Sequence, residues 1–386
     1  KQFKRLGVVG DWENYYSTMS FDAEAQIVRE LGKFLKEGSL YRGYKPVLWS
    51  TVEKTALAEA EVEYKDIEST AITVGFKITN TQEVILKDTY VPIWTTTPWT
   101  IPANRAIAFS SKYEYGLYEV IEIEEGSLAK IGEKIIINNS LKENLENASK
   151  TKINLIQNVD EIEKLVCQHP FNSLGYDFDI PLLEGEFVTD ETGTGFVHIA
   201  PSHGQDDYDL ASKNGIEAPF MIDDEGVYLP SVKIFAGKKV YDDDGSYGDG
   251  NGAVIKELIN CNALFAKGKL RHQYPHSWRS KAPLLFRNTP QWFISMEKND
   301  LRKKALKAID ETAFYPERGR DRIKSMIETR PDWCISRQRI WGGHLPLFVS
   351  KKTNEPLKDP EVIENIAKIY EKEGADRSFT DDPQRF

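Results

Sequence analysis

The chain has 386 residues, enough for two or three domains, and its 40% hydrophobic and 28% charged residues are typical of a globular protein. It lacks the ~18 consecutive apolar residues that a transmembrane helix needs, and Lys1–Arg5 lack the apolar core of a signal peptide. The net charge of −10 disfavours nucleic acid as a partner of the chain as a whole.

The first part of the chain, residues 1–54, is expected to be mostly helical. Apolar residues recur there at helical spacing, and Gly38 follows them as a C-cap. These apolar residues are Ile27, Val28, Leu31, Phe34 and Leu35. The chain does not begin with Met, and we expect it to be a piece of a longer polypeptide.

Residues 55–260 are predicted to form a mostly antiparallel, barrel-like domain. Runs of β-branched and aromatic residues alternate there with Gly, Asn or Ser. The strands that we expect are Ala71–Ile78, Tyr90–Trp94, Ala106–Phe109, Tyr115–Ile123 and Lys134–Ile137. The polar stretch 138–152 is predicted to be a loop or a short surface helix.

The last part, residues 261–386, is basic and aromatic, with helical spacing around Leu301–Ile309 and Val362–Tyr370. Residues 261–340 carry 18 Lys/Arg against 8 Asp/Glu. Such a stretch is typical of local contact with phosphates, and equally of a solvated surface that happens to be basic. The predicted fold class is therefore α+β or mixed, with α-rich segments on either side of the barrel-like domain.

The first motif with groups suited to binding or catalysis is Trp94–Thr100, in which three consecutive threonines precede Pro98 at the end of a predicted strand. Side chains alternate along a strand, so Thr95 and Thr97 are predicted to point one way and Thr96 the other. Clustered hydroxyls can hold a ribose, an adenine or an attacking water. A threonine-rich strand edge without function explains the same residues.

The second motif runs from Gly193 to Tyr208 and contains two glycines, His198 and a pair of acids, Asp206 and Asp207. The glycines permit a tight turn and close approach of the backbone to a ligand. A carboxylate in such a pocket attracts an ammonium group. One of the acids can instead cap a helix that starts near Tyr208, and His198 is either a general base or a satisfied, partly buried histidine.

Two further segments, Tyr274–Phe293 and Arg330–Gly342, interleave arginine with tryptophan. Such residues stack bases and pair phosphates, or pack against each other at a domain interface. The three cysteines, Cys167, Cys261 and Cys334, lie far apart and match neither a disulfide framework nor a paired metal site. A reducing, cytoplasmic setting is therefore expected.

As a set, these motifs resemble class I aminoacyl-tRNA synthetases for branched aliphatic amino acids. They are, in chain order, ALAEAEVEY (56–64), WTTTPWTIPAN (94–104), GTGFVHIAPSHGQDDY (193–208), TPQWF (289–293) and RPDWCISRQRIWGG (330–343). The resemblance extends over nearly the whole chain, from Gly10 to Trp341. Thr97 before the proline and Trp99 after it resemble the isoleucine enzymes, whereas the valine and leucine enzymes usually have Arg and an acid there.

The resemblance implies roles for single residues of a post-transfer editing site, which is an insertion in a Rossmann catalytic domain. Asp207 matches the acid that binds the α-ammonium of the misattached amino acid. His198 matches the residue that excludes the isoleucyl side chain. The residues expected around the ribose, the carbonyl and the water are Thr95, Thr96, Thr97, Thr100 and Asn104, with Trp99 expected to bind substrate. The segments 1–54 and 261–386 are then pieces of the catalytic domain and its other insertions.

The chain departs from the complete family pattern in its ATP-binding and metal-binding motifs. Neither a His-x-Gly-His sequence nor a Lys-Met-Ser-Lys-Ser loop occurs, so we expect no amino-acid activation. Ser277 and Ser280 stand where some family members carry cysteines, so we expect no zinc.

The expected function is hydrolysis of valyl-tRNA(Ile) within an isoleucine–tRNA ligase. Editing is expected to need no cofactor, whereas the full-length enzyme would use ATP with magnesium. The expected partners are tRNA and misattached valine, without a membrane, and the protein is expected to be a monomer. The alternatives are the editing segment of a valine or leucine enzyme and a non-catalytic tRNA-binding module.

Overall fold

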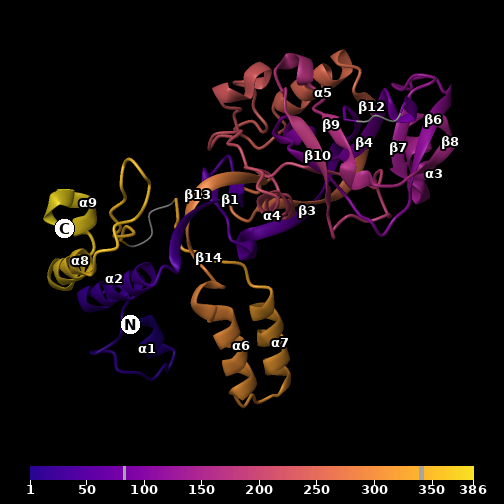
Figure 1. Ribbon diagram of the computed structural model, residues 1–386. Helices are drawn as coiled ribbons and strands as arrows, with labels where there is room; N and C mark the ends of the chain where they lie inside the picture. Colours follow the sequence, from indigo (N-terminus) through magenta and orange to yellow (C-terminus); the bar gives the residue numbers. More distant parts are fainter. Residues whose placement is uncertain (81–83, 339–342) are drawn as a thin grey trace. The chain divides into compact units, whose positions relative to one another are not determined.

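The computed structural model describes residues 1–80, 84–338 and 343–386. They form two compact units: residues 1–44 with 290–386, and residues 45–289. The helices are α1 (Gln2–Arg5), α2 (Phe21–Lys36), α3 (Lys142–Ser149), α4 (Gln205–Lys213), α5 (Gly250–Asn260), α6 (Leu301–Glu311), α7 (Arg318–Glu328), α8 (Pro360–Glu373) and α9 (Arg377–Thr380) (Figure 1).

Most of the strands lie in the second unit, whereas β14 lies in the first, and β1 and β13 contain residues of both. They are β1 (Leu40–Ser50), β2 (Thr55–Ala56), β3 (Val62–Lys77), β4 (Thr89–Thr95), β5 (Ala106–Phe109), β6 (Tyr115–Ile123), β7 (Lys134–Asn138), β8 (Thr151–Val159), β9 (Val166–Gln168), β10 (Asp179–Glu184), β11 (Val197–Ile199), β12 (Leu264–Ser277), β13 (Leu285–Ile294) and β14 (Trp333–Cys334). The predicted strands at 106–109 and 115–123 are confirmed with their bounds. The short helix predicted within 138–152 is confirmed as α3.

In the unit 45–289, one curled sheet runs in the order β8-β6-β7-β4-β11-β5-β10-β9, and β3 joins it by pairing with β4. A bridge between Ile78, just after β3, and Cys167 in β9 brings the sheet back on itself. The predicted barrel-like, mixed fold is thereby confirmed. Most strand pairs are antiparallel, while β4 with β7, β4 with β11 and β5 with β10 are parallel.

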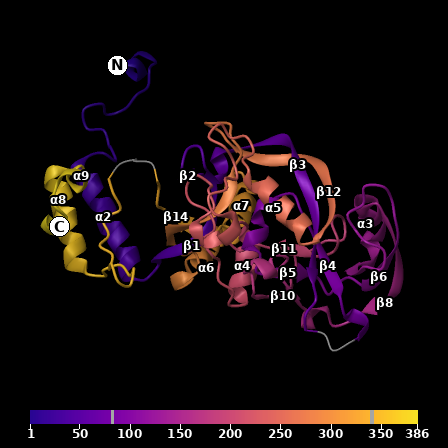
Figure 2. The same cartoon turned by 90° about the horizontal axis from the view of Figure 1, so that it is seen from above.

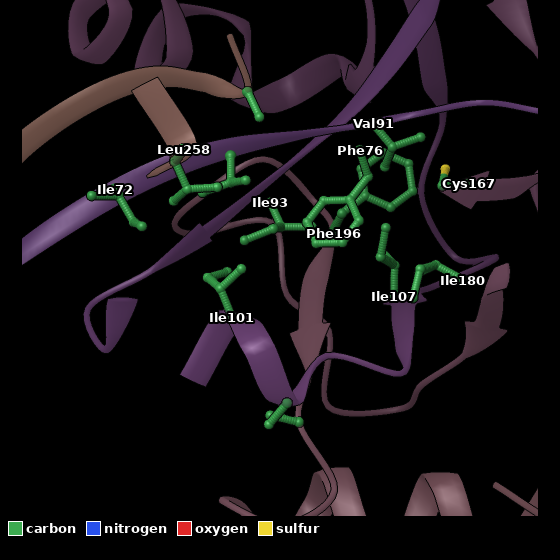
Figure 3. Close-up of a cluster of buried hydrophobic side chains, with 14 of the residues drawn as sticks. Ile72, Phe76, Val91, Ile93, Ile101, Ile107, Cys167, Ile180, Phe196 and Leu258 are labelled. Atoms are coloured by element: carbon green, nitrogen blue, oxygen red, sulfur yellow. The ribbon is translucent and has the colours of Figure 1, made fainter. Parts of the chain in front are cut away.

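The interior of the curled sheet is a continuous apolar core. Figure 3 shows its centre, to which β3, β4, β5, β9, β10 and the residue just before β11 contribute side chains. The labelled residues are Ile72, Phe76, Val91, Ile93, Ile101, Ile107, Cys167, Ile180, Phe196 and Leu258, all at most 4% exposed. Residues that alternate with these along β5, β6 and β7 form two smaller buried apolar clusters, so those strands are covered on both faces.

β3 and β12 form a long antiparallel ribbon that extends beyond the curled sheet (Figure 2). Their pairing runs from Val74 with Leu264 to Val62 with Ser277. On its exposed parts Lys269 pairs with Glu68 across the strands. Because β12 pairs with β3, this compact unit extends to Thr289, further than the barrel-like segment 55–260. The division into three domains at 54 and 260 stays a prediction.

In the other unit, α2 and α8 pack through apolar faces that include Val28, Leu35 and Ile366. At the edge of this contact Arg29 binds Glu364 at 3.1 Å and is also paired with a second glutamate of α8. Helices α6 and α7 form a hairpin (Figure 1). The helices predicted around 27–35, 301–309 and 362–370 are therefore confirmed as α2, α6 and α8.

The helical prediction for residues 1–54 is wrong for 40–50, which form β1. The sequence contains the reason, because Gly43 and Pro46 both disfavour a helix while Tyr41, Val47 and Trp49 favour a strand. β1 ends in an antiparallel pairing of Trp49 with Ala56 in β2. Gly38 does terminate α2 as predicted, with φ of 74° two residues after its last residue.

Candidate active site

A pocket of about 280 Å³ opens within the unit 45–289, where β4 ends beside β11. The parallel pairing of Trp94 with Val197 brings the threonines after β4 next to His198. The start of α4 supplies a further side. The residues that line the pocket are Trp94, Thr95, Thr96, Thr97, Thr100, Phe187, Thr189, Thr192, Gly193, Gly195, Phe196, Val197, His198, Ala200, His203 and Asp207.

Threonine hydroxyls gather where β4 gives way to a 3-10 helix at Pro98–Ala103. Thr95 Oγ1 lies 3.1 Å from Thr97 Oγ1 and accepts a hydrogen bond from the Thr97 backbone N–H. Thr100 Oγ1 donates to the Thr97 carbonyl at 2.9 Å. Thr95 and Thr97 therefore share a side, as predicted. Thr96 lines the pocket as well, because β4 ends at Thr95 and strict alternation stops there.

His198 lies in the middle of β11 and is 7% exposed. Its Nε2 is 2.9 Å from Thr100 Oγ1, and its Nδ1 is 2.7 Å from Asn104 Nδ2. Burial, together with the neighbouring His203, lowers the pKa of His198 to about 3. The ring is therefore neutral at physiological pH, with both nitrogens engaged by threonine and asparagine side chains.

Asp207 lies in the first turn of α4, and its Oδ2 accepts a hydrogen bond from the Ala200 backbone N–H at 2.7 Å. Burial raises the pKa of Asp207 to about 7, although that hydrogen bond acts in the opposite direction. The exposed Asp206 raises it slightly more. The pocket thus contains a carboxyl group that a cationic ligand would return to its ionised form.

The alternative that one of the two acids caps the helix is wrong. Helix α4 begins at Gln205 rather than near Tyr208, and its N-cap residue is Gly204. A side chain at Gly204 would collide with Asp207, since its Cβ would lie 2.8 Å from the carboxyl carbon. The glycine therefore leaves room for the carboxylate to turn back toward the Ala200 N–H.

The described residues that line the pocket do not include Trp99 and Asn104. Trp99 is buried, donates its backbone N–H to Asn251 Oδ1 at 3.0 Å and packs edge-on against His203 at 4.5 Å between ring centres. Asn104 is fully buried behind His198. The other predicted site residues, including Asp207 and the threonines, are brought together in the lining.

Several lining residues carry no signal in the sequence. Phe187, Thr189 and Thr192 come from the loop before β11, and no local pattern distinguishes them from other loop residues. His203 belongs to the second motif, but the motif alone predicts no role for it. Its Nδ1 donates to the Phe286 carbonyl at 2.8 Å, and burial lowers its pKa to about 4.

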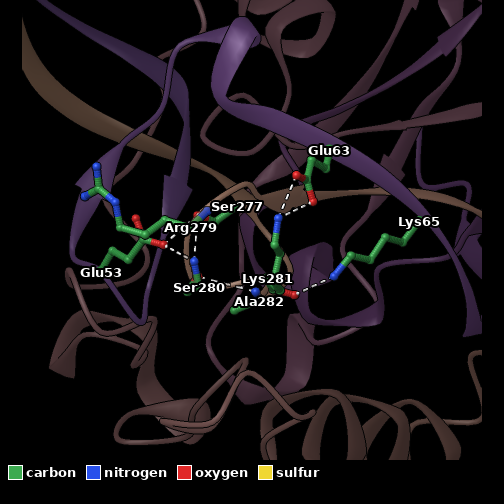
Figure 4. A network of polar contacts seen from close by, with 8 residues as sticks. All are labelled: Glu53, Glu63, Lys65, Ser277, Arg279, Ser280, Lys281 and Ala282. Atoms are coloured by element: carbon green, nitrogen blue, oxygen red, sulfur yellow. Dashed lines mark hydrogen bonds and ion pairs between the residues drawn. The ribbon is translucent and has the colours of Figure 1, made fainter.

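Figure 4 shows the contacts of Ser277 and Ser280, which belong to the segment Tyr274–Phe293. Ser277 Oγ donates to the Glu53 carboxylate, and the Ser280 backbone N–H donates to the same oxygen at 2.9 Å. Trp278 between them is 48% exposed, with Arg279 over its ring at 5.4 Å. A carboxylate thus fixes this turn through serine and backbone donors.

The segment Arg330–Gly342 lies in the other unit, and its residues 339–342 fall outside the described residues. Its first part is anchored by Ser336, whose Oγ donates to Gln291 and accepts from the Trp292 N–H at 2.9 Å. Within residues 1–80, 84–338 and 343–386, no group of three or more His, Cys, Asp or Glu could hold a metal ion. The zinc content of the protein stays a prediction.

No helix in the described part of the chain is long and apolar enough to span a bilayer.

The fold and the motifs agree with the comparison to known families. Residues 1–385 match the model for tRNA synthetases class I (I, L, M and V), and the chain belongs to this family. Its curated relatives include isoleucine–tRNA ligases. It is 57% identical over 389 residues to the enzyme of Pelagibacter ubique, covering 100% of this chain and 42% of that protein. For Bradyrhizobium diazoefficiens the identity is 47% over 409 residues, covering 99% and 41%.

The chain therefore spans about two fifths of the length of these curated relatives. The resemblance to synthetases for branched aliphatic amino acids is confirmed, with isoleucine–tRNA ligases among the relatives. Solved structures with weaker likeness include GlLeuRS-CP1, at a TM-score of 0.37 and 16% identity, covering 51% of this chain and 99% of that one. Another is the editing domain of P. falciparum cytosolic leucyl-tRNA synthetase, at 0.29 and 11%, covering 39% and 68%.

Proposed function

We propose that the pocket hydrolyses the ester of valine wrongly attached to isoleucine tRNA, as part of an isoleucine–tRNA ligase. The observation that carries the proposal is the convergence of Thr95, Thr96, Thr97, His198 and Asp207 in one pocket. A module that only binds tRNA needs positive charge, but it does not need a partly buried carboxyl group beside a row of hydroxyls. The names of the relatives support isoleucine as the cognate amino acid.

Editing is a physical necessity for an enzyme that selects isoleucine, because valine is smaller by one methylene. The discrimination that one methylene provides is about 150-fold, a general value already established for isoleucine enzymes as a class. A second pocket must therefore admit valine and exclude isoleucine. We assign the excluding wall to His198, which is buried, neutral and fixed at the pocket lining.

Asp207 is assigned to the α-ammonium group of the misattached valine. The carboxyl group already accepts one backbone hydrogen bond, which orients it, and its pKa is raised mainly by burial. An ammonium group in the pocket supplies a positive charge that favours the ionised carboxylate. The pair then holds the ester carbonyl at a fixed place relative to the hydroxyls of Thr95 and Thr97, which is how orientation accelerates attack.

Hydrolysis requires a water that attacks the ester carbonyl carbon and donors that stabilise the oxyanion formed there. Threonine hydroxyls can accept a hydrogen bond from the water and donate to the oxyanion. The bond from the carbonyl carbon to the ribose oxygen then breaks, that oxygen takes up the proton that the attacking water loses, and free valine and tRNA leave. The donors and acceptors of this pocket supply these contacts without a cofactor.

The partners follow from the same proposal. The 3′ end of isoleucine tRNA would enter the pocket, and the basic stretch 261–340 would contribute phosphate contacts. ATP with magnesium belongs to amino-acid activation by the longer ligase. The sequence contains neither of the two ATP-binding motifs, so no step of hydrolysis is assigned to that nucleotide.

A deacylation assay with Asp207→Ala tests the proposal. Asp207→Ala should reduce hydrolysis of valyl-tRNA(Ile) at least about tenfold, because a charged hydrogen bond contributes roughly 1.5–3 kcal/mol. Asp206→Ala is the matched control, because Asp206 is equally acidic, one residue away and exposed. It should retain most of the activity. The proposal is wrong if folded Asp207→Ala protein, checked by circular dichroism, hydrolyses valyl-tRNA at the parental rate.

A further inference from the structure

The two ring nitrogens of His198 are held by Thr100 and Asn104, which come from the 3-10 helix Pro98–Ala103 and the residue directly after it. Thr100 Oγ1 lies 2.9 Å from Nε2, and Asn104 Nδ2 lies 2.7 Å from Nδ1. Thr100, Asn104 and His198 are all buried. When both ring nitrogens of a histidine are hydrogen-bonded, the donors and acceptors around them determine the tautomer. The hydrogen bonds of Thr100 and Asn104 therefore determine which nitrogen of His198 carries the proton.

Thr100 must accept a hydrogen bond from His198. The Thr100 hydroxyl has one proton, and it donates that proton to the Thr97 carbonyl at 2.9 Å, an oxygen that can only accept. The Thr100 oxygen therefore faces Nε2 with a lone pair. Nε2 must then carry the ring proton, and it donates to Thr100 Oγ1.

Asn104 must donate to His198. Its amide nitrogen donates one proton to the Ala106 carbonyl at 2.9 Å and the other to Nδ1. The opposite orientation of the amide would place its oxygen against the Ala106 oxygen, with two acceptors in contact and no proton between them. Nδ1 is therefore the unprotonated nitrogen, and its only lone pair is occupied.

The two constraints agree on one form of the ring, neutral and protonated at Nε2. The other titratable groups that line the pocket, His203 and Asp207, leave this form in place: His203 disfavours a positive charge on His198, and Asp207 is turned to the Ala200 N–H. His198 thus has no free lone pair with which to take a proton from water. The inference therefore excludes the alternative that His198 acts as a general base.

We propose that Thr100 and Asn104 are positioning residues that lock His198 in its Nε2–H tautomer and in one ring orientation, which makes it a rigid wall of the pocket. This inference rests on the proposed function, because a wall has a role only if an amino acid enters. It also assigns a role to Asn104, which acts through His198 and does not touch the substrate.

The lock is tested by NMR of the full chain labelled with ¹⁵N-histidine. The chain has 6 histidines, and the His198 signals are identified by their loss in His198→Gln. We expect a protonated Nε2, an unprotonated Nδ1 and no titration of this ring between about pH 5 and 8. A proton on Nδ1 in the parent protein, or titration in that range, would overturn the inference.

Asn104→Asp reverses one constraint without changing the size of the side chain. Whether ionised or protonated toward the Ala106 carbonyl, the new carboxyl group presents an acceptor to Nδ1, so we expect the ring proton to appear there. Asn138→Asp is the matched control: Asn138 is 2% exposed and its Oδ1 accepts from the Ser140 N–H, a contact that aspartate keeps. It should leave the His198 signals unchanged. Asn104→Asp with Nδ1 still unprotonated would contradict the inference.

Asn104→Ala separates positioning from contact with substrate. Because one restraint on the wall is lost, the ratio of valyl- to isoleucyl-tRNA hydrolysis should fall about tenfold, while KM for valyl-tRNA stays near the parental value. A lower kcat with the ratio unchanged would instead place Asn104 at the water or the ester and refute the positioning role. A parent protein that hydrolyses neither ester contradicts the proposed function, and the ring signals alone then decide whether the lock exists.

Discussion

The ionised carboxylate of Asp207 lowers the stability of the folded protein at neutral pH. Its side chain is partly buried, accepts a hydrogen bond from one backbone donor, and has a pKa of about 7 instead of the ordinary value of 3.8. Keeping such a group charged at neutral pH opposes folding, since burial penalises the ionised form. Under the proposed function an ammonium group would offset this cost, because it pairs with the ionised carboxylate.

This cost predicts a pH-dependent stability difference for Asp207→Asn. Because the pKa is higher in the folded than in the unfolded protein, the stability contributed by the carboxyl is fully present below about pH 4 and is lost as pH rises through about 7. Asparagine does not ionise, so the variant should be more stable than the parent at pH 8, by on the order of 2 kcal/mol, and nearly equal at pH 4. Urea midpoints at both pH values measure this, with Asp206→Asn as an exposed control. Equal midpoints at pH 8 would contradict it.

At the scale of elements, strands with a local signal could be predicted and long-range pairing could not. β5 and β6 were located to the residue because β-branched and aromatic runs end there at polar turns. The extent of β3 and β12 depends instead on their mutual pairing, which joins residues far apart in the chain. The Gly268–Arg271 part of β12 is mostly polar and exposed, so nothing in its own sequence identifies it as a strand.

The same distinction explains which site residues could be found from the sequence. Thr95, His198 and Asp207 stand in motifs that a family resemblance identifies. Phe187 and Thr189 line the pocket through the fold of the loop that joins β10 to β11, which leaves no trace in local composition. Positions such as these depend on the assembled sheet.

The loop that precedes β11 gives a prediction at this scale. Gly195 has φ of 84°, and a Cβ there would lie 2.3 Å from Asn138 Cβ. Gly195→Ala should therefore destabilise the protein by about 1–3 kcal/mol and displace His198, three residues on, with a loss of deacylation. Gly193→Ala is the matched control, because its φ of 79° is equally strained but its Cβ would lie 3.4 Å from the nearest atom. If both variants lose the same stability and activity, the close approach to Asn138 is not what requires glycine.

At the scale of the whole molecule, every residue of the proposed pocket belongs to the unit 45–289. The other unit supplies part of the basic stretch, including Lys303, Lys304 and Arg318 on α6 and α7. The rest of the basic stretch, residues 261–289, lies in the same unit as the pocket. The net charge of −10 is the sum of a basic stretch at 261–340 and an acidic remainder, and only the first suits contact with phosphates.

The absence of both ATP-binding motifs from the sequence predicts that the chain hydrolyses misacylated tRNA but does not activate amino acids. Activation needs ATP bound at the His-x-Gly-His and Lys-Met-Ser-Lys-Ser motifs of the family, and neither sequence occurs here. Hydrolysis needs the ester, a water and the polar groups of the pocket, which are all present once aminoacyl-tRNA binds. We therefore expect no isoleucine-dependent ATP–pyrophosphate exchange above a no-enzyme control, while the same preparation deacylates valyl-tRNA(Ile) without ATP. A full-length isoleucine–tRNA ligase serves as the positive control for exchange. Exchange by this chain would show that it binds ATP through residues outside both motifs. Deacylation that depends on ATP would contradict the proposed function, which separates ester hydrolysis from amino-acid activation.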